Sequence, residues 1–372
     1  MKVGYFTMPL HPPGSNITET LESDLQQIIL LDQLGYSEAW IGEHFTAPWE
    51  PIPSPDILIA QALMQTERIK LGTGAHLLPF HHPVELASRV AYLDHLAQGR
   101  YMFGIGSGGL QSDHELFGVD MESGQHREMT RESLDIILNL WEHVDGPFKY
   151  EGKFWSINIP NPEDYAFANL RAHITPYQKP HPPIGVAGAS PGSDTLKLAG
   201  ERGYIPMSLG LNEVYVASHW DAVIEGAQAG GKVPPSRREW RIVRDIWVAE
   251  TDEEAREGAI NGMLGRAWEE YLLPLFSNGA YPFLTFMKHD QSLKDEDVTL
   301  DWLLPKIASG SIIIPSNNVR PQKIHNVGIG KGMKTKVNVN IGTSTLNVNV
   351  EEEVEKAKVA VKYHADTIMD LS

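Results

Sequence analysis

The sequence predicts a TIM barrel, the α/β fold in which parallel strands alternate with covering helices around one closed sheet. Seven strand–helix units follow one another through residues 2–276. Their strands are almost continuously apolar, as strands are when helices cover both faces of a parallel sheet. The series resumes after an insertion and never breaks into two halves. An open doubly wound sheet is the alternative architecture.

The first four units occupy about 145 residues. Each strand is a short apolar run, and the first helix repeats apolar residues at three-and-four spacing before it ends at Gly35, a typical helix stop. We expect strands at residues 2–8, 37–44, 69–78 and 100–108, and helices at 19–35, 55–67, 82–100 and 129–144.

An insertion interrupts the series at residues 150–183. Its alternating aromatic residues and its proline and asparagine punctuation predict a hairpin followed by an irregular excursion. With more than 30 residues it is long enough to suggest a function such as that of a lid. The units then resume, with strands at 183–188, 204–210 and 240–250 and helices at 193–203, 214–231 and 252–276.

Composition limits the possible functions. The chain has no cysteine, which excludes disulfides, a thiolate nucleophile, and zinc or iron–sulfur sites held by thiolates. The formal net charge of −17 disfavours binding to nucleic acid or to an anionic membrane. No apolar run reaches the roughly 18 residues that span a bilayer, and the N-terminus has no signal pattern. We therefore expect a cytoplasmic protein.

The second strand ends in two residues that carry chemistry. Residues 39–45 are AWIGEHF, so an apolar run ends in Glu43 and His44 and opens onto a loop. The catalytic groups of α/β enzymes tend to lie at such strand ends. An imidazole there can give or take a proton near neutral pH, although a lone histidine is more often structural.

A glycine-rich stretch, GIGSGG at residues 104–109, follows the fourth strand. It matches the spacing of the dinucleotide-binding fingerprint, but that fingerprint needs a helix directly after the glycines. Residues 110–127 predict a loop instead, and the unit is the fourth rather than the first. We interpret the small residues as a strand end that a flat cofactor can approach closely.

Histidines after the third strand raise the question of a metal site. His76, His81 and His82 could act together with His44, because imidazoles suit zinc or iron. The His-x-His pair at the end of the first strand, as in metal-dependent barrel hydrolases, is missing. His82 precedes Pro83 and is more typical of a helix start. We expect no metal.

The stretch SPGS at residues 190–193 joins the fifth strand to a helix. A serine- and glycine-containing loop at a helix N-terminus presents free backbone N–H groups and the positive end of the helix dipole, both of which suit a phosphate. From these residues alone, a plain serine N-cap is an equally good interpretation.

In this order and spacing, the motifs resemble the bacterial luciferase-like flavin monooxygenases. The resemblance covers about residues 1–300 and rests on EHF after the second strand, GTGAHLLPFHHP, LDHLAQGRYMFGIGSG and PIGVAGASPGS. It implies a TIM barrel that uses reduced, diffusible FMN from a separate flavin reductase together with O2. It also implies insertion of one oxygen atom into a small organic substrate, and a homodimer or a related heterodimer.

The resemblance also assigns roles to residues. It implies that His44 is the catalytic histidine, with Glu43 orienting the imidazole or bridging to neighbouring backbone. The residues implied to bind the cofactor are Gly74, Ala75, Gly106 and Ser107 at the flavin ring and Arg127, Gly188, Ala189, Ser190 and Ser193 around the phosphate. Apolar residues at or just beyond strand ends are candidate substrate contacts, namely Phe6, Trp49, Phe80 and Met207.

Two other functions are compatible with the same motifs. Deazaflavin-dependent oxidoreductases that transfer a hydride share this barrel, so the motifs favour FMN without proving it. A non-enzymatic alternative is an inactive flavin-binding protein whose cofactor site has been spoiled by a foreign C-terminal segment.

That segment begins at about Pro305, where the family pattern stops. Residues 306–372 instead resemble the early part of phosphomethylpyrimidine synthase, a radical-SAM enzyme, in the stretches GSIIIPSN, VGIGKG, TKVNVNIGTS, VEEEVEKAKVAV and ADTIMDLS. Without cysteines the segment cannot hold that enzyme's cluster. It predicts a βαβ unit with its helix at 350–365. We expect two domains, 1–305 and 306–372, the second either closing the barrel or merely appended to it.

Overall fold

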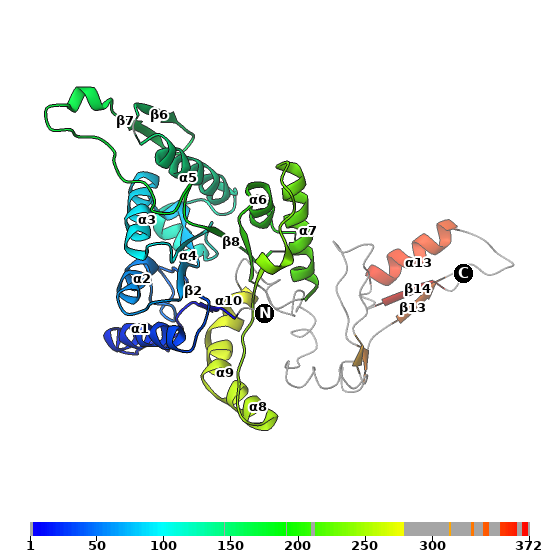
Figure 1. The fold of residues 1–372 in the computed structure, drawn as a ribbon. Helices are drawn as coiled ribbons and strands as arrows, with labels where there is room; N and C mark the ends of the chain where they lie inside the picture. The colour runs from blue at the N-terminus through cyan, green and yellow to red at the C-terminus, as the bar shows by residue number, and fades with distance from the viewer. Residues whose placement is uncertain are drawn as a thin grey trace. The chain divides into compact units, whose positions relative to one another are not determined.

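The structure is a computed structural model that describes residues 3–144, 146–190, 192–209 and 213–278 (Figure 1). In the C-terminal part it describes the short segments 312–313, 329–330, 338–341, 350–362 and 367–370. The chain divides into two compact units, Met1–Phe286 and Met287–Ser372. Each unit is described by itself.

The first unit is built on one parallel sheet. Its strands pair in the order β1-β2-β3-β5-β8-β9-β10, with β4 beside β5. They are β1 (Tyr5–Thr7), β2 (Glu38–Ile41), β3 (Lys70–Thr73), β4 (His76–Leu77), β5 (Tyr101–Gly106), β8 (Ile184–Gly188), β9 (Ile205–Leu209) and β10 (Arg241–Val243). The strands follow chain order without the reversal of a doubly wound sheet. The predicted barrel is therefore confirmed.

An ion pair connects β10, the last strand of this path, to β2, which is the second. Arg241 on β10 donates from Nε and Nη2 to the two carboxylate oxygens of Glu38 on β2, at 2.9 and 3.0 Å. The same carboxylate accepts a hydrogen bond from Trp40 Nε1 at 3.0 Å. Bidentate pairs of this kind fix geometry as well as charge. The strand at the end of the path is thereby held close to β2, so the sheet is nearly closed.

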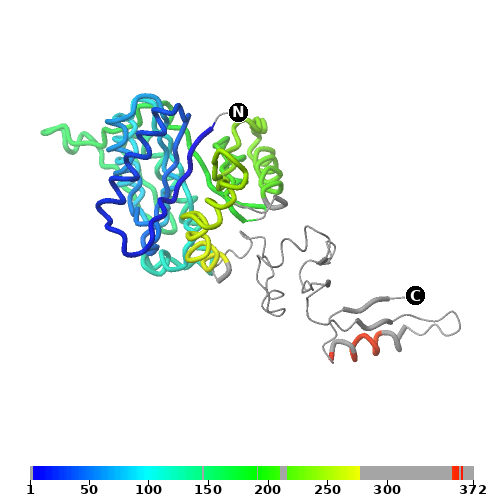
Figure 2. The backbone as a smooth tube through the Cα atoms, turned by 90° about the horizontal axis from the view of Figure 1, so that it is seen from below, coloured from blue at the N-terminus to red at the C-terminus, as the bar shows by residue number. Residues whose placement is uncertain are grey.

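Helices cover the outside of the sheet (Figures 1 and 2). They are α1 (Ile17–Gln33), α2 (Pro55–Leu63), α3 (Pro83–Ala97), α5 (Gln125–Glu142), α6 (Asp194–Arg202) and α7 (Glu213–Ala229). Local sequence explains their starts: the Asn16 side chain accepts from Thr18 N at the start of α1, and His82 precedes Pro83 at the start of α3 as expected. The largest apolar core lies between the sheet and α1, α2, α3 and α5.

Trp40 explains several glycines of the barrel interior. Its ring packs with Met102 and Met207 in a cluster on the inner side of the sheet. A Cβ atom added at Gly72 would stand 2.5 Å from this ring, and one at Gly185 would stand 2.8 Å away. Close packing leaves no room for such an atom. Glycine on β3 and on the more distant strand β8 therefore makes space for the indole of the AWIGEHF motif.

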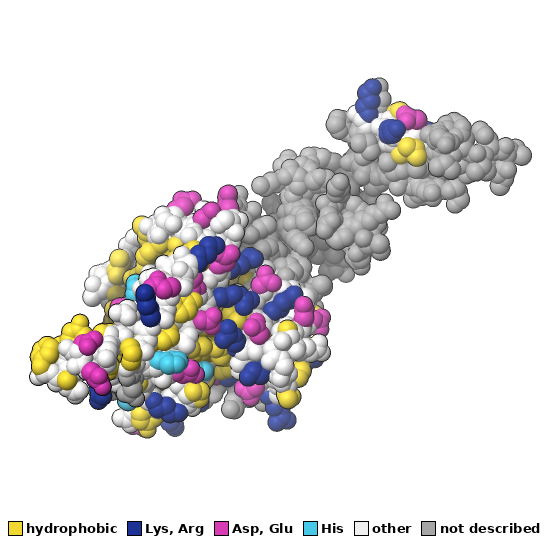
Figure 3. Space-filling model, turned by 90° about the horizontal axis from the view of Figure 1, so that it is seen from above, with side chains coloured by type: hydrophobic (Ala, Val, Ile, Leu, Met, Phe, Trp, Pro, Cys, Tyr) yellow, Lys and Arg dark blue, Asp and Glu magenta, His cyan; other side chains and the backbone are white. Residues whose placement is uncertain are grey.

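The insertion contains the predicted hairpin, formed by β6 (Phe148–Glu151) and β7 (Ser156–Ile159), followed by the short 3-10 helix η2 (Pro162–Tyr165). Glu132 on α5 anchors the hairpin turn, because its carboxylate accepts three backbone N–H groups, from residues 153, 154 and 155, each at 3.0 Å. The excursion beyond the hairpin extends away from the sheet (Figure 1), and hydrophobic side chains gather at this end of the molecule (Figure 3). Phe167 and Leu170 in this excursion are exposed. Its role as a lid stays a prediction.

Three predicted elements were wrong in detail. Residues 111–117 form helix α4 (Gln111–Phe117) where we expected a loop, since Gly118 at φ 67° ends a helix that is too short for periodicity to reveal. The seventh strand is limited to β10, whereas residues 240–250 were expected to form it. The long last helix is divided into α8 (Asp252–Asn261), α9 (Met263–Ala267), the π-helical turn η4 (Trp268–Leu272) and α10 (Leu273–Asn278). The break between α8 and α9 falls at Gly262, whose backbone is extended.

The second unit contains the predicted βαβ arrangement. Strand β13 (Asn338–Ile341) pairs in parallel with β14 (Thr367–Asp370), and helix α13 (Val350–Lys362) connects them along the chain. Strands β11 (Ile312–Ile313) and β12 (Ile329–Gly330) form a separate antiparallel pair. The expected domain boundary near Pro305 lies outside the described residues, and closure of the barrel by the segment stays a prediction. Among the described helices, none combines the length and apolarity that crossing a membrane requires.

Candidate active site

His44 lies between two carboxylates at the end of β2. Its Nδ1 is 3.1 Å from Asp113 Oδ2, and its Nε2 is 3.3 Å from Glu50 Oε2. Burial alone would lower the pKa of His44, but the charges of Glu50 and Asp113 outweigh burial and raise it. The imidazole therefore holds its proton to higher pH than a free histidine does.

Asp113 is itself held by the loop that follows His44. Its Oδ1 accepts hydrogen bonds from the backbone N–H groups of Phe45 and Thr46, at 3.2 and 2.8 Å, and from the Thr46 hydroxyl at 2.5 Å. Burial raises the pKa of Asp113, but the bonds from His44 and Thr46 lower it further than burial raises it. Asp113 therefore stays ionised and fixes the ring of His44.

Glu50 connects the site to the π-helical turn η4, which contains Tyr271. The Tyr271 hydroxyl donates to Glu50 Oε2 at 2.9 Å, and the Tyr271 ring stacks on Trp49 with centroids 5.8 Å apart and planes at 9°. Burial raises the pKa of Glu50, and the charge of His44 opposes that rise. Residues far along the chain thus complete the surroundings of the histidine.

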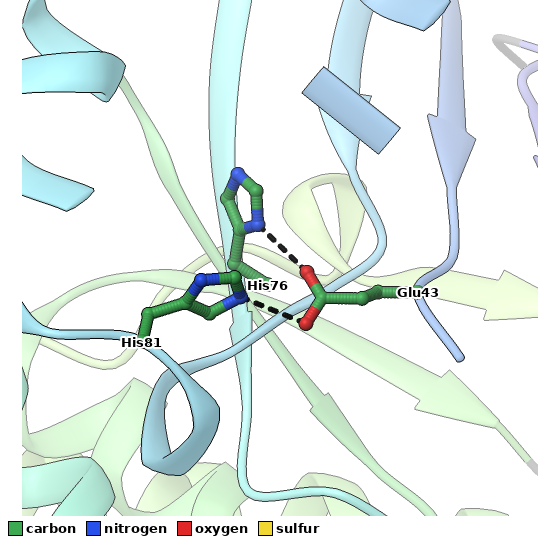
Figure 4. Close-up of side chains that lie close together, drawn as sticks. All are labelled: Glu43, His76 and His81. Atoms are coloured by element: carbon green, nitrogen blue, oxygen red, sulfur yellow. Dashed lines mark hydrogen bonds and ion pairs between the residues drawn. The ribbon is translucent and has the colours of Figure 1, made fainter. Parts of the chain in front are cut away.

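Glu43 belongs to a separate cluster in which Glu43 and His76 are buried and His81 is partly buried. Its carboxylate oxygens lie 2.9 Å from His76 Nδ1 and 2.8 Å from His81 Nε2 (Figure 4). Burial would raise the pKa of Glu43, but the bonds from the two imidazoles lower it to about 2. Of the two roles expected for Glu43, the contact with the His44 ring is not made, because Asp113 and Glu50 lie at both ring nitrogens of His44. The bridge to backbone is present, since Leu77 N donates to Glu43 Oε1 at 3.4 Å. Glu43 instead connects the end of β2 to β4 and the turn η1 (Leu78–Phe80).

The cluster of Glu43, His76 and His81 has the composition of a metal site, and its ligand atoms lie within 4.8 Å of one another. However, Arg89 Nη2 lies 3.2 Å from His81 Nδ1. A guanidinium only donates, so His81 Nδ1 accepts and the proton sits on Nε2, facing Glu43. A metal would need the lone pair of that Nε2, so the geometry favours the hydrogen-bonded arrangement. The absence of a metal stays a prediction.

The residues expected at the flavin ring lie at the ends of β3 and β5. A Cβ atom added at Gly106 would stand 3.3 Å from Ala75 Cβ, and one added at Gly74 would stand 3.0 Å from Phe6. The Ser107 hydroxyl accepts from Thr130 Oγ1 on α5 at 2.9 Å. Small residues at the ends of the paired strands β3 and β5 therefore lie together, as the approach of a flat ring requires.

The residues expected at the phosphate also come together. Ser193 caps α6, with its hydroxyl accepting from Leu196 N at 3.4 Å, and Gly188 leaves space for it, since a Cβ there would stand 2.5 Å from that hydroxyl oxygen. Arg127 on α5 lies 3.6 Å from Asp194, the first residue of α6. A cation at a helix N-terminus is a donor set that fits the phosphate of FMN. Ala189 and Ser190 lie in the same loop.

The four candidate substrate contacts do not form one group. Phe6 and Met207 belong to the Trp40 cluster of the barrel interior. Trp49 is buried against Tyr271, and Phe80 stacks on Phe117 with centroids 4.7 Å apart. Phe6 and Met207 are therefore the better candidates for contact with a substrate. Contact of Trp49 and Phe80 with a substrate stays a prediction.

Asp113, Glu50 and Tyr271 were missed from the sequence as members of the site. Each is separated from the strand ends by a loop or a helix, and none belongs to a motif. Only the acidic residue within SDHELF, close after the glycine-rich stretch, gave a signal that could have identified Asp113. Burial of a carboxylate against a histidine is a property of the folded chain.

Two protein families match successive parts of the chain. The family described as luciferase-like monooxygenase matches residues 1–299, and the radical SAM ThiC family matches residues 286–372. Both resemblances drawn from the motifs are confirmed. The 2,5-diketocamphane 1,2-monooxygenase 1 of Pseudomonas putida is 34% identical over 278 residues, which are 74% of this chain and 76% of that protein.

Two further relatives bear on the cofactor and on partners. The oxygenating constituent of 3,6-diketocamphane monooxygenase of Pseudomonas putida, a type II Baeyer-Villiger monooxygenase solved in complex with FMN, superposes with a TM-score of 0.71 at 31% identity, covering 82% of this chain and 83% of that one. The oxygenase component of the flavin-dependent trigonelline monooxygenase of Acinetobacter baylyi is 29% identical over 235 residues, 62% of this chain and 60% of that protein.

Proposed function

Because the chain belongs to the luciferase-like monooxygenase family, we propose that it is the oxygenase component of a two-component system. It takes reduced FMN from a separate flavin reductase and inserts one atom of O2 into a small, largely apolar organic substrate. That the chain is a flavin-dependent monooxygenase with FMN as cofactor follows from the named monooxygenases and the FMN-bound relative. The trigonelline enzyme supports a reductase partner, since its name describes an oxygenase component.

The observation that carries the proposal is the gathering of three chemical functions at the carboxyl ends of neighbouring strands. His44 follows β2, the small residues Ala75 and Gly106 lie at the ends of β3 and β5, and the loop after β8 meets Arg127. This is where parallel α/β barrels place their catalytic groups. The three functions are an acid or base, a surface for a flat ring, and an anion site.

The residues of the chain have distinct roles in this proposal. Reduced FMN supplies the electrons that activate O2, of which one atom enters the substrate while the other leaves as water. His44 donates or accepts the proton, and its Nδ1 and Nε2 are oriented by Asp113 and Glu50. The apolar side chains of Phe6 and Met207 favour an apolar substrate beside the site. Relatives named for diketocamphanes are consistent with such a substrate.

Cofactor binding and oxygen use test the proposal directly. The purified full-length chain should bind FMN in a spectral titration, and with reduced FMN it should oxygenate a substrate without any hydride transfer from a deazaflavin. Turnover with a reduced deazaflavin but not with reduced FMN would establish the hydride-transfer alternative. FMN binding without protection of reduced flavin during reoxidation, and without substrate oxygenation, would identify an inactive flavin-binding fusion.

Arg127→Ala should weaken FMN binding while leaving the fold intact. A hydrogen bond to a charged group contributes about 1.5 to 3 kcal/mol, and the lower end applies because the Arg127 side chain is 57% exposed. We therefore expect an increase in Kd of roughly tenfold, measured by quenching of flavin fluorescence. An unchanged Kd would place the phosphate elsewhere.

Asp194→Asn is the matched control for this change. It also removes the ion pair between Arg127 and Asp194, but it leaves the guanidinium free to bind phosphate and removes a competing carboxylate. FMN affinity should therefore stay equal or rise. A loss of affinity like that of Arg127→Ala would mean that the ion pair itself maintains the site.

A further inference from the structure

Helix α7 contacts the loop at residues 188–193 through two consecutive side chains. The Gly192 backbone N–H donates to the Ser218 hydroxyl at 3.0 Å, and His219 Nε2 lies 2.9 Å from the backbone carbonyl oxygen of Ser190. The side chain of His219 is fully buried. His219 contacts Ser190, before the glycine of this loop, whereas Ser193, after that glycine, caps α6. The loop is thus fixed at both ends.

The direction of the hydrogen bonds around His219 follows from the chemistry of its neighbours. Trp240 Nε1 can only donate, and it lies 2.8 Å from the Ser208 hydroxyl oxygen. The hydroxyl proton of Ser208 is then available for His219 Nδ1 at 3.0 Å. With Nδ1 accepting, the ring proton sits on Nε2 and donates to the carbonyl of Ser190. Ser208 on β9 thereby sets the tautomer of His219.

The charge state of His219 agrees with this chain of bonds. Burial lowers the pKa of His219, and the carbonyls of Ser190 and Ala189 only partly oppose this effect, while Arg244 adds to it. A neutral imidazole can accept at one nitrogen and donate at the other at the same time. At neutral pH, hydrogen bonds therefore run without a break from Trp240 through Ser208 and His219 to the Ser190 carbonyl.

A loop that binds phosphate has to keep its carbonyl oxygens away from the anion, because two partial negative charges repel. The bond from His219 holds the Ser190 carbonyl against α7. The first N–H groups of α6 have no partner within the helix, and together with Arg127 they supply the donors for the anion. We propose that His219, assisted by Ser218, is a positioning residue that holds Ser190 and Gly192 in the conformation that binds the phosphate of FMN. This inference rests on the proposed phosphate site.

Comparison of FMN with riboflavin, which lacks the phosphate, tests the role of His219. His219→Leu removes the donor to Ser190 and should raise the Kd for FMN about tenfold, while the Kd for riboflavin stays within about twofold. His219→Gln keeps an amide donor that can reach Ser190, so it should bind FMN nearly as well as the unaltered chain. Equal weakening of both flavins, or no change in either, would overturn the role.

Amide hydrogen exchange of the protein without flavin gives a second measurement. His219→Leu should speed exchange in residues 188–196 while the strands of the barrel exchange as before. Faster exchange throughout the barrel would show that His219 maintains the fold rather than the loop. Failure of the phosphate site itself is recognised separately, because the unaltered chain would then bind FMN and riboflavin with the same Kd.

Discussion

His44→Ala should lower turnover by about two orders of magnitude or more, the size usual for loss of a general acid or base. FMN affinity should stay within about tenfold, because the residues at the ring and at the phosphate lie elsewhere. The alanine variant also leaves Asp113 and Glu50 without their shared partner. Turnover at saturating FMN is therefore to be measured together with the thermal unfolding temperature.

His44→Asn separates proton transfer from packing. The asparagine amide can still donate to Asp113, which should keep the loop after β2 in place, but it cannot titrate. Turnover should fall as far as in the alanine variant while thermal stability recovers. Normal turnover in either variant would mean that His44 has only a structural role.

The pH dependence of turnover should reflect the carboxylates around His44. Their charges raise its pKa, so if the protonated form acts as the acid, activity is present below that raised pKa and is lost as pH rises through it. Glu50→Gln removes one of the two charges and should move the alkaline fall in activity to lower pH. A profile unaffected by Glu50→Gln would assign the titration to another group.

Much of the barrel could be predicted, because apolar strands and amphipathic helices alternate regularly along the sequence. Strands β1 to β9 and helices α1 to α7 lie close to the expected ranges, apart from α4. Helix α4 has only seven residues, and its position depends on Asp113 binding the loop that follows His44. Such a helix is stabilised by tertiary contacts rather than by its own propensity.

The part of the site at the end of the second strand could be predicted, because its residues are adjacent in the sequence. The contacts between segments that are distant in the sequence could not. Glu43 and His44 are adjacent in sequence, yet their side chains enter different networks because neighbours on an extended chain point to opposite sides. The partners of His44 are 6 and 69 residues away, at Glu50 and Asp113. A single sequence shows which residues are apolar or charged, but contacts of this range are decided by packing.

Glu43 should have the largest effect on stability. Glu43→Ala leaves His76 Nδ1 and His81 Nε2 buried without the carboxylate that both contact. Breaking a buried charged network by removing one partner costs about 3 to 5 kcal/mol. We expect a loss of that size in the free energy of unfolding, measured by urea denaturation at neutral pH. A loss below about 0.5 kcal/mol, the range of an ordinary surface change, would show that the cluster is not a stabilising element.

Glu43→Gln should destabilise the fold less than Glu43→Ala, because of the tautomers that His76 and His81 can adopt. The glutamine oxygen can accept from His81, whose tautomer Arg89 fixes, but the amide then donates toward His76. His76 must move its proton to Nε2, an atom that is buried and has no hydrogen-bond partner among the described residues. An unsatisfied buried polar group costs about 1 to 3 kcal/mol. This variant should therefore lose less stability than the alanine variant.

Acid should reduce the difference between the unaltered chain and Glu43→Gln. The pKa of Glu43 is lowered from 4.5 to about 2 in the folded chain, so its contribution is complete above pH 4.5 and is lost as pH falls toward 2. About 1 kcal/mol of the difference in unfolding free energy should disappear between pH 7 and pH 4. A constant difference would mean that the folded-state pKa is not depressed.

Turnover and metal binding in the same variants decide what the cluster does. Glu43 is buried and touches neither ring nitrogen of His44, so we expect it to act on catalysis by holding the ends of β2 and β4 together. Glu43→Gln should then lower turnover per folded molecule, while FMN affinity changes little. Turnover equal to that of the unaltered chain would leave Glu43 with a role in stability alone. A rise in unfolding temperature with Zn²⁺ that His81→Ala abolishes would instead show that the three side chains bind a metal, with the Arg89 contact to His81 broken.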